Sequence, residues 1–470
     1  MLENWLMWFI LGLFVVIYGL RAIRDARHVF SPALLVSALT FGVFVKSYFE
    51  FEPVVLAVFL DQDYYFMTLC YTALCLLAFC LMQEYGRRRP LTPSALDNAA
   101  DRLPVYLIVS YVSILGVVGF AAQLAVASLA GGVTEYYSVA HGGAADVSGM
   151  SAYVHGLPNF MWPALIIGYV TLKTRSMPPA LRLVLMIVTG AVGLALFAHT
   201  FLFGNRNGII RFCLIFGAVY AFVNRPTMAK SLPLFVGLAF GGICVSVVAE
   251  IRQHLHLGSE VSLVDALGEY FTRSKDAGGI KLYADYLGGH ELFINVATVQ
   301  ATWVTGEHDY GATYIYPLIN FIPRAWWPEK PYATQFSIDF FSLIPTVTGW
   351  QPGYGSAIGA VGESFLALSW FGFIPWAVVG FFSGRYINRC WTSPTVMNLG
   401  LLSAVLVGLV FWATQTFVGF FNGWFFTVAP FYGLRLLARV RTFSAPPRRV
   451  TVTTYITATP AIRTQDIEDV

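Results

Sequence analysis

Residues 183–223 read LVLMIVTGAVGLALFAHTFLF, then GNRN, then GIIRFCLIFGAVYAFV, so two apolar runs are separated by only four residues. A helix of roughly 17 to 25 apolar residues is long enough to cross the hydrocarbon core of a bilayer. Because the connection is so short, the two helices must lie antiparallel as neighbours. This stretch predicts an all-α, polytopic membrane protein.

The composition of the whole chain agrees with this prediction. The 470 residues are 57% hydrophobic and 12% charged, with a mean hydropathy of +0.65, outside the range of soluble proteins. We expect the lipid bilayer as its surroundings and no nucleic acid as a partner. Eleven transmembrane helices are expected near residues 5–20, 30–49, 64–82, 103–130, 157–172, 183–203, 208–223, 232–249, 357–384, 395–418 and 420–437. A count of ten or twelve stays open, because 357–384 is long and 51–60 is a further apolar stretch.

Basic residues follow every second predicted helix, and 20 of the 29 Lys and Arg residues lie on that side. Under the positive-inside rule the N-terminus is external and the C-terminus is cytoplasmic. The chain then divides into an eight-helix bundle (1–249), a large external loop (250–355), three further helices (356–438) and a disordered cytoplasmic tail (439–470). None of the six cysteines falls in an external loop, so no structural disulfide is expected.

The external insert is about 105 residues long and carries IPRAWWPEKP at 322–331. Its prolines fix the backbone, and Arg324 offers a planar fork that matches phosphate oxygens, with Lys330 as a second cation. Alternatively, Trp326 and Trp327 are interfacial anchors and both cations contact lipid headgroups. Elsewhere in the insert, 261–274 has the spacing of an interfacial helix, and 292–304 and 332–347 are apolar but too short to span a membrane. We expect these short helices to pack on the outer mouth of the bundle.

Two further motifs carry charge at the predicted outer surface. FGNRNGIIR at 203–211 places Arg206 in a turn and Arg211 just inside the next helix, where a charge is costly unless it is functional or reaches the headgroups. QPGYGSAIGAVGESF at 351–365 places Glu363 in an apolar helix after glycines that permit close backbone approach. Glu363 is either a partner for an arginine or a general base.

These three motifs, in this order around a large external loop, resemble the oligosaccharide repeat-unit polymerases of Wzy type. The resemblance runs from about residue 200 onward, and the first five predicted helices match in hydropathy alone. One departure is Asn205, since a small residue is common before the arginine. The resemblance implies a glycosyltransferase of the bacterial inner membrane that joins undecaprenyl-pyrophosphate-linked repeat units at the periplasmic face. The product would be O-antigen, capsule or exopolysaccharide, with a flippase and a chain-length regulator as possible partners.

The residue chemistry suits that activity. A glycosyl diphosphate has a good leaving group, so cations must stabilise the departing diphosphate while one carboxylate activates the acceptor hydroxyl. We expect Glu363, Arg324 and Arg206 as catalytic residues, with Asp276 as the next choice of base. The expected substrate-binding residues are Arg211, Lys330, Arg273, Trp326, Trp327 and Tyr354. No His, Asp or Glu cluster has metal-ligand spacing, so we expect no metal or other cofactor.

Two other functions remain open. A transporter or flippase of the same lipid-linked glycan would be expected to contain two related halves and short loops, which the sequence lacks. An O-antigen ligase would use the same donor with a lipid A-core acceptor, and the sequence separates it poorly from a polymerase.

Overall fold

In a computed structural model the described part of the chain is all-α and contains no strand. It comprises residues 2–58, 60–89, 103–129, 156–202, 206–226, 230–256, 272, 291–319, 322, 326–329, 335–350, 358–414 and 416–444. Among these residues, eight helices are long and apolar enough to cross a membrane. The predicted all-α, polytopic class is therefore confirmed, whereas the count of eleven stays a prediction.

The membrane-length helices and their shorter partners follow the chain in order. They are α1 (Leu2–Arg24), α2 (Pro32–Val58), α3 (Gln62–Arg88), α5 (Val105–Leu129), α8 (Met161–Thr174), α9 (Pro179–Leu202), α10 (Arg206–Asn224), α11 (Leu232–His256), α14 (Glu291–Thr305), α15 (Ala312–Ile319), α16 (Gln335–Thr348), α17 (Gly359–Leu368), α18 (Phe373–Thr392), α19 (Val396–Thr414) and α20 (Phe417–Ser444). Short 3-10 helices η1 (Ala26–Phe30), η3 (Leu157–Phe160) and η5 (Ser369–Gly372) connect some of them.

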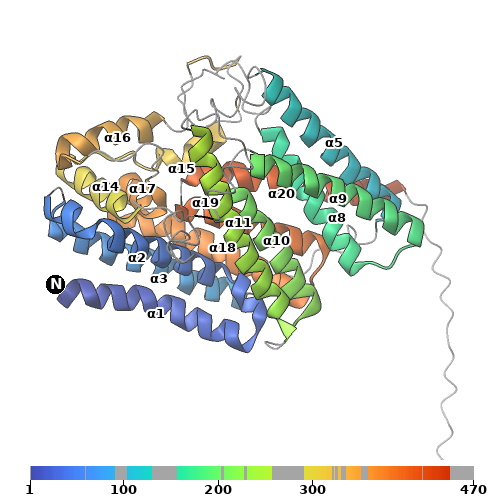
Figure 1. The fold of residues 1–470 in the computed structure, drawn as a ribbon, viewed down its shortest axis with the longest axis horizontal. Coiled ribbons are helices and arrows are strands. Elements are labelled where there is room, and N and C mark those ends of the chain that lie inside the picture. The colour runs from blue at the N-terminus through green and yellow to red at the C-terminus, as the bar shows by residue number, and fades with distance from the viewer. Residues whose placement is uncertain are drawn as a thin grey trace, which may run out of the picture.

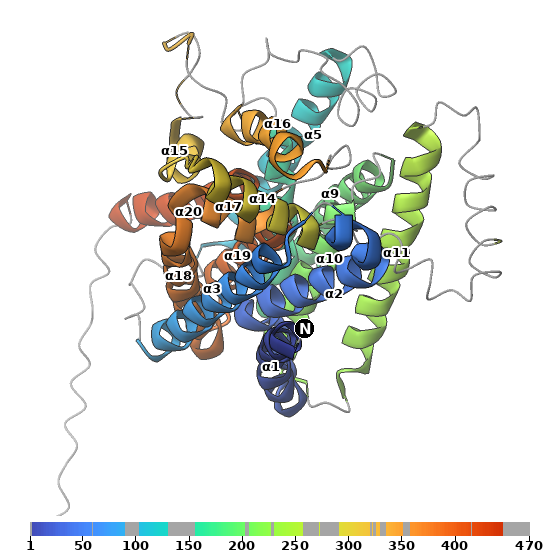
Figure 2. The same cartoon turned by 90° about the vertical axis from the view of Figure 1, so that its left-hand side faces the viewer.

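Helix α19 lies in the middle of the fold (Figures 1 and 2). It is apolar all round, and such a helix is normally buried. Leu402 and Leu406 pack into a core shared with α5, α8, α9 and α10, whereas Leu409 and Trp412 pack into a second core with α1, α2, α3, α14 and α17. The molecule therefore has two helical halves that meet along α19.

The predicted tight hairpin is confirmed, and the two spans predicted at 395–418 and 420–437, which nearly adjoin, form a second one. In the α9–α10 pair, a Cβ on Gly208 would lie 2.6 Å from Cγ2 of Thr200, so the two helices touch at their connected ends. In the α19–α20 pair, a Cβ on Gly408 would lie 2.8 Å from the Phe420 ring. All six cysteines are free, as predicted.

Helices α3 and α18 pack backbone to backbone and run parallel. Gly380 lies against the backbone of Phe79, and Gly384, four residues on, lies against that of Gln83. Any larger residue at either glycine would meet main-chain atoms that cannot move aside. Because both contacts advance in the same direction, the basic ends of α3 and α18 lie at the same end of the bundle.

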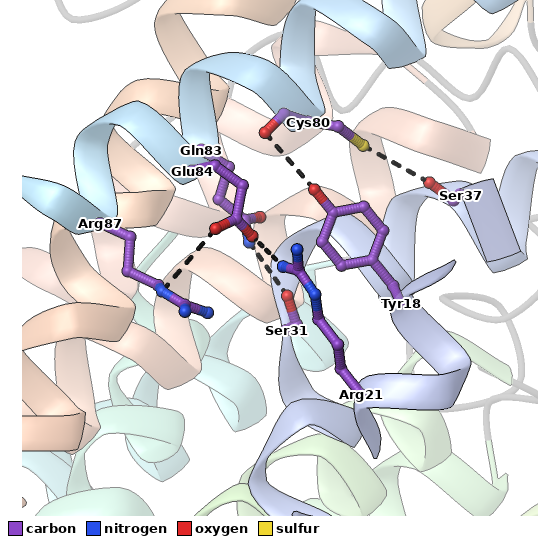
Figure 3. Close-up of polar contacts among 8 residues, drawn as sticks. All are labelled: Tyr18, Arg21, Ser31, Ser37, Cys80, Gln83, Glu84 and Arg87. Atoms are coloured by element: carbon purple, nitrogen blue, oxygen red, sulfur yellow. Dashed lines mark hydrogen bonds and ion pairs between the residues drawn. The ribbon is translucent and has the colours of Figure 1, made fainter. Parts of the chain in front are cut away.

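A polar cluster ties α1 and α2 to α3 near that basic end (Figure 3). Arg21 of α1 forms an ion pair with Glu84 of α3, and Nε of Arg87 lies 3.9 Å from the other Glu84 oxygen. Nε2 of Gln83 donates to Oγ of Ser31, just before α2, at 3.0 Å. These contacts fix the ends of three helices whose outer faces are apolar.

Helix α14 differs from the expectation for the insert. Its residues from Leu292 to Thr302 are almost all buried, and it packs against α17, α16, α2 and α3. Burial of its apolar side chains, among them Leu292, Phe293 and Ile294, stabilises this position. Part of the insert therefore belongs to the core of the bundle. The expected helices within 261–287 lie outside the described residues.

The helix predicted over 357–384 corresponds to one of the eight candidate spans, Gly359–Thr392, and it is interrupted. Helix α17 ends at Leu368, Ser369 has φ +52°, and α18 begins after η5. The carbonyls of Leu366 and Ala367 at the end of α17 accept backbone N–H groups of Asp309 (3.2 Å) and Gly311 (3.0 Å). A break inside a membrane helix is tolerated where protein satisfies the freed groups, and here the insert does so.

Candidate functional site

A buried carboxylate lies at the tip of the α19–α20 hairpin. Glu363 of α17 is 1% exposed, and its Oε2 accepts the backbone N–H of Phe417, the first residue of α20, at 2.7 Å. Its Oε1 is buried and has no hydrogen-bond partner. No described Lys or Arg forms an ion pair with it, so the predicted role as an arginine partner is not met within the described residues. A buried carboxylate oxygen without a hydrogen-bond donor costs free energy unless a ligand supplies the donor or the carboxylate takes up a proton.

A cation without a carboxylate partner lies against the same hairpin. The guanidinium carbon of Arg211 of α10 lies 4.4 Å from the Phe411 ring centroid and 5.4 Å from that of Trp162. Its Nη1 donates to Oδ1 of Asn159 at 3.3 Å, and its Nε is buried without a partner. No described carboxylate forms an ion pair with it. The aromatic faces compensate only part of the cost of burying this charge.

The two charges come from different halves of the molecule. Nη2 of Arg211 lies 3.9 Å from the position of a Cβ on Gly423, whereas Glu363 contacts Phe417. These two positions on α20 are six residues apart, which corresponds to about 9 Å along a helix axis. A buried carboxylate and a partly buried guanidinium, whose Nε is buried, therefore contact one hairpin without pairing with each other.

The structure describes only some of the predicted site residues, and their predicted roles stay predictions. Arg206 begins α10, five residues before Arg211, so it lies at the helix start. Trp326 is 82% exposed and Trp327 is 39% exposed, so neither is a core residue. The remaining predicted residues lie outside the described part of the chain: Arg273, Asp276, Arg324, Lys330 and Tyr354. Their convergence on one ligand stays a prediction.

A polar cluster behind Glu363 was missed in the sequence. Oγ of Ser364 accepts the hydroxyl of Tyr314 at 3.0 Å and the indole N–H of Trp376 at 2.9 Å. Burial and the nearby Glu363 carboxylate raise the pKa of Tyr314 well above its usual value, so Tyr314 remains a neutral donor. Asn295 of α14 is also buried, and its Oδ1 accepts the N–H of Gly362. The sequence feature that could have revealed this cluster was Asn295, a polar residue within the apolar run 292–304, because polar residues in a bilayer are costly.

Among the described residues, no three His, Cys, Asp or Glu side chains lie close enough together to bind a metal ion. The chain matches no protein family, no curated protein and no solved structure.

Proposed function

We propose that this protein is a membrane glycosyltransferase that polymerises lipid-linked oligosaccharide repeat units carried on undecaprenyl pyrophosphate. One observation carries the proposal: the buried carboxylate of Glu363 and the partly buried guanidinium of Arg211 contact one helical hairpin, and neither has an ion-pair partner among the described residues. A diphosphate would neutralise the cation, and an acceptor hydroxyl would donate to the carboxylate. The insert with its Pro-Arg and Trp-Pro elements and the resemblance to Wzy-type polymerases support the same activity.

The proposed reaction balances with these groups. Glu363 accepts the proton of the acceptor sugar hydroxyl, whose oxygen forms a bond to the anomeric carbon of the donor. The bond from that carbon to the diphosphate oxygen breaks, and the oxygen keeps the electron pair. Arg211, together with Arg206, Arg324 and Lys330, stabilises the negative charge that develops there. A hydrolase that cleaves glycosidic bonds needs two carboxyl groups around the bond. Among the described residues Asp309 is the acid nearest in effect to Glu363, and its oxygens already accept the N–H groups of Gly311 and Thr313.

The reaction is assigned to the periplasmic face of a bacterial inner membrane, on the basis of the charge asymmetry. A reporter fused after Asp285 is expected to be periplasmic. Reporters fused after Arg225 and after Arg441 are expected to be cytoplasmic. Activity of paired phosphatase and fluorescent reporters measures each position. A cytoplasmic signal at Asp285 would place the candidate site on the wrong side and contradict the proposal.

Arg324 is expected to act through its planar guanidinium. Arg324→Ala should abolish polymer, and Arg324→Lys should be nearly as harmful, because an ammonium cannot bind two phosphate oxygens in the same fork. Glycan ladders on a gel, at matched protein level, measure the effect. Full-length polymer from Arg324→Ala would leave this arginine as a headgroup contact.

The decisive experiment supplies purified full-length protein in nanodiscs with the lipid-linked repeat unit that accumulates in cells lacking this protein. A ladder of longer lipid-linked chains supports polymerisation. Transfer only to added lipid A-core would identify a ligase instead.

One observation favours a second candidate, a transporter of the same glycan. The α17–η5–α18 segment is an interrupted helix with a buried carboxylate in its shorter part, and transporters build substrate and ion sites from such helices. Movement of the repeat unit across vesicle membranes, without elongation, would support this candidate and contradict the polymerase.

A further inference from the structure

One side chain of α14 forms a hydrogen bond to the first turn of α17, the short helix that carries Glu363. Asn295 is 2% exposed, and its Oδ1 accepts the N–H of Gly362, the residue just before Glu363. Its Nδ2 donates to the carbonyl of Glu291 at 2.5 Å. Both ends of the Asn295 amide are therefore used, one within α14 and one on the backbone of α17.

Two glycines of α17 make this close approach possible. A Cβ on Gly362 would lie 3.0 Å from Oδ1 of Asn295, and a Cβ on Gly359 would lie 3.3 Å from its Nδ2. Gly359 also has φ +73°, a conformation that other residues rarely adopt. The glycines that precede Glu363 in the sequence therefore admit Asn295 against the first turn of α17.

The far end of α17 is held by the loop that follows α14. Besides its two backbone bonds to Leu366 and Ala367, this loop is stiffened by Asp309, whose carboxylate accepts the N–H groups of Gly311 (2.9 Å) and Thr313 (3.0 Å). Residues 291–314 thus fix α17 at both ends. Helix α17 has only 10 residues and no side-chain cap of its own, so its position depends on these contacts.

We propose that Asn295 is a positioning residue that fixes the direction of the Glu363 carboxylate through the backbone of Gly362. This inference rests on the proposed function, because it assigns Asn295 a part in the reaction of that site. A displacement of about 1 Å between a catalytic group and its substrate can reduce a rate by roughly 100-fold. The loss should therefore appear in kcat, with the KM for the donor unchanged, because Asn295 itself does not touch the diphosphate.

The test measures kcat and KM per folded protein, in nanodiscs, with the lipid-linked repeat unit from cells lacking this protein. Asn295→Ala is expected to lower kcat about 10- to 100-fold without changing KM. The matched control is Thr302→Val, seven residues on along the same face of α14. Its buried hydroxyl has no hydrogen-bond partner, so kcat should stay at the wild-type value.

A second variant perturbs the same contact from the other side and leaves Asn295 in place. Gly362→Ala should also lower kcat, because its methyl group would lie 3.0 Å from Oδ1 of Asn295 and 2.8 Å from Cγ2 of Ile358. In the Asn295→Ala background the contact with Asn295 is gone and only the contacts with Ile358 and Thr298 remain, so the combined loss in kcat should be smaller than the sum of the two single losses. Additive losses in kcat, or a wild-type kcat in Asn295→Ala, would overturn the inference.

The Glu363→Gln variant, measured in parallel, separates this inference from the proposed function. An inactive Glu363→Gln with a fully active Asn295→Ala contradicts only the positioning role. An active Glu363→Gln contradicts the base role itself.

Discussion

Glu363→Gln is expected to abolish polymer and to leave single repeat units on the lipid, while the protein folds normally. The amide oxygen can still accept the N–H of Phe417, so the contact that joins α17 to α20 is retained. The amide cannot accept the proton of an acceptor hydroxyl at the pH of the reaction. General-base catalysis contributes roughly 10² to 10⁴ in rate, so a loss of that size is expected. Glycan ladders at matched expression, with the thermal unfolding temperature as a measure of folding, check both statements.

The matched control for this variant is Glu307→Gln, which removes an exposed acid from the loop after α14 and should leave the ladder unchanged. Glu363→Asp keeps the charge but shortens the side chain, so an intermediate ladder is expected. Partial function in Glu363→Gln would instead indicate a residue that orients an arginine. A normal ladder would exclude the base role, and Asp276→Asn, tested beside it, would then become the critical variant.

Arg211→Met is expected to lower the rate of polymerisation and to leave the stability of the protein unchanged or higher. The loss of one group that stabilises developing charge typically costs roughly 10² to 10³ in rate. The partly buried guanidinium has no described carboxylate partner, so its removal relieves a desolvation cost at the buried Nε and leaves no described opposite charge behind. Arg211→Lys should be nearly as inactive, because lysine lacks the planar fork. The initial rate with the lipid-linked repeat unit and the thermal unfolding temperature are the two measurements.

Arg21→Met provides the contrasting control. Arg21 pairs with Glu84 at the opposite, basic end of α3 (Figure 3), so its removal should lower the unfolding temperature slightly and leave the rate per folded protein unchanged. Arg211→Met should thus lower the rate without lowering the unfolding temperature, whereas Arg21→Met should lower the unfolding temperature without lowering the rate. If Arg211→Met unfolds at a much lower temperature and its activity follows the folded amount, Arg211 is structural and the diphosphate site is contradicted.

The sequence by itself determined where the helices lie and which neighbours form hairpins. Long apolar runs are local signals, because each span must satisfy its own backbone hydrogen bonds inside a bilayer. The four residues after 203 and the two residues after Thr414 leave no room for anything except an antiparallel turn. The positions of charged residues are also local information. The sequence therefore identified Glu363 and Arg211 as charges within apolar runs, where a charge is energetically costly.

Only the tertiary structure decided how those charges are placed and what holds them. The break after Leu368 depends on backbone donors from Asp309 and Gly311, which lie more than fifty residues earlier in the chain. The contact of Asn295 with Gly362 spans 67 residues, and that of Glu363 with Phe417 spans 54. Hydrophobic periodicity reports only which face of a helix is apolar and carries no information on which distant segment covers it. For that reason α14 was expected on the outer mouth of the bundle, and it is found buried, where it packs against the helix that carries the candidate base.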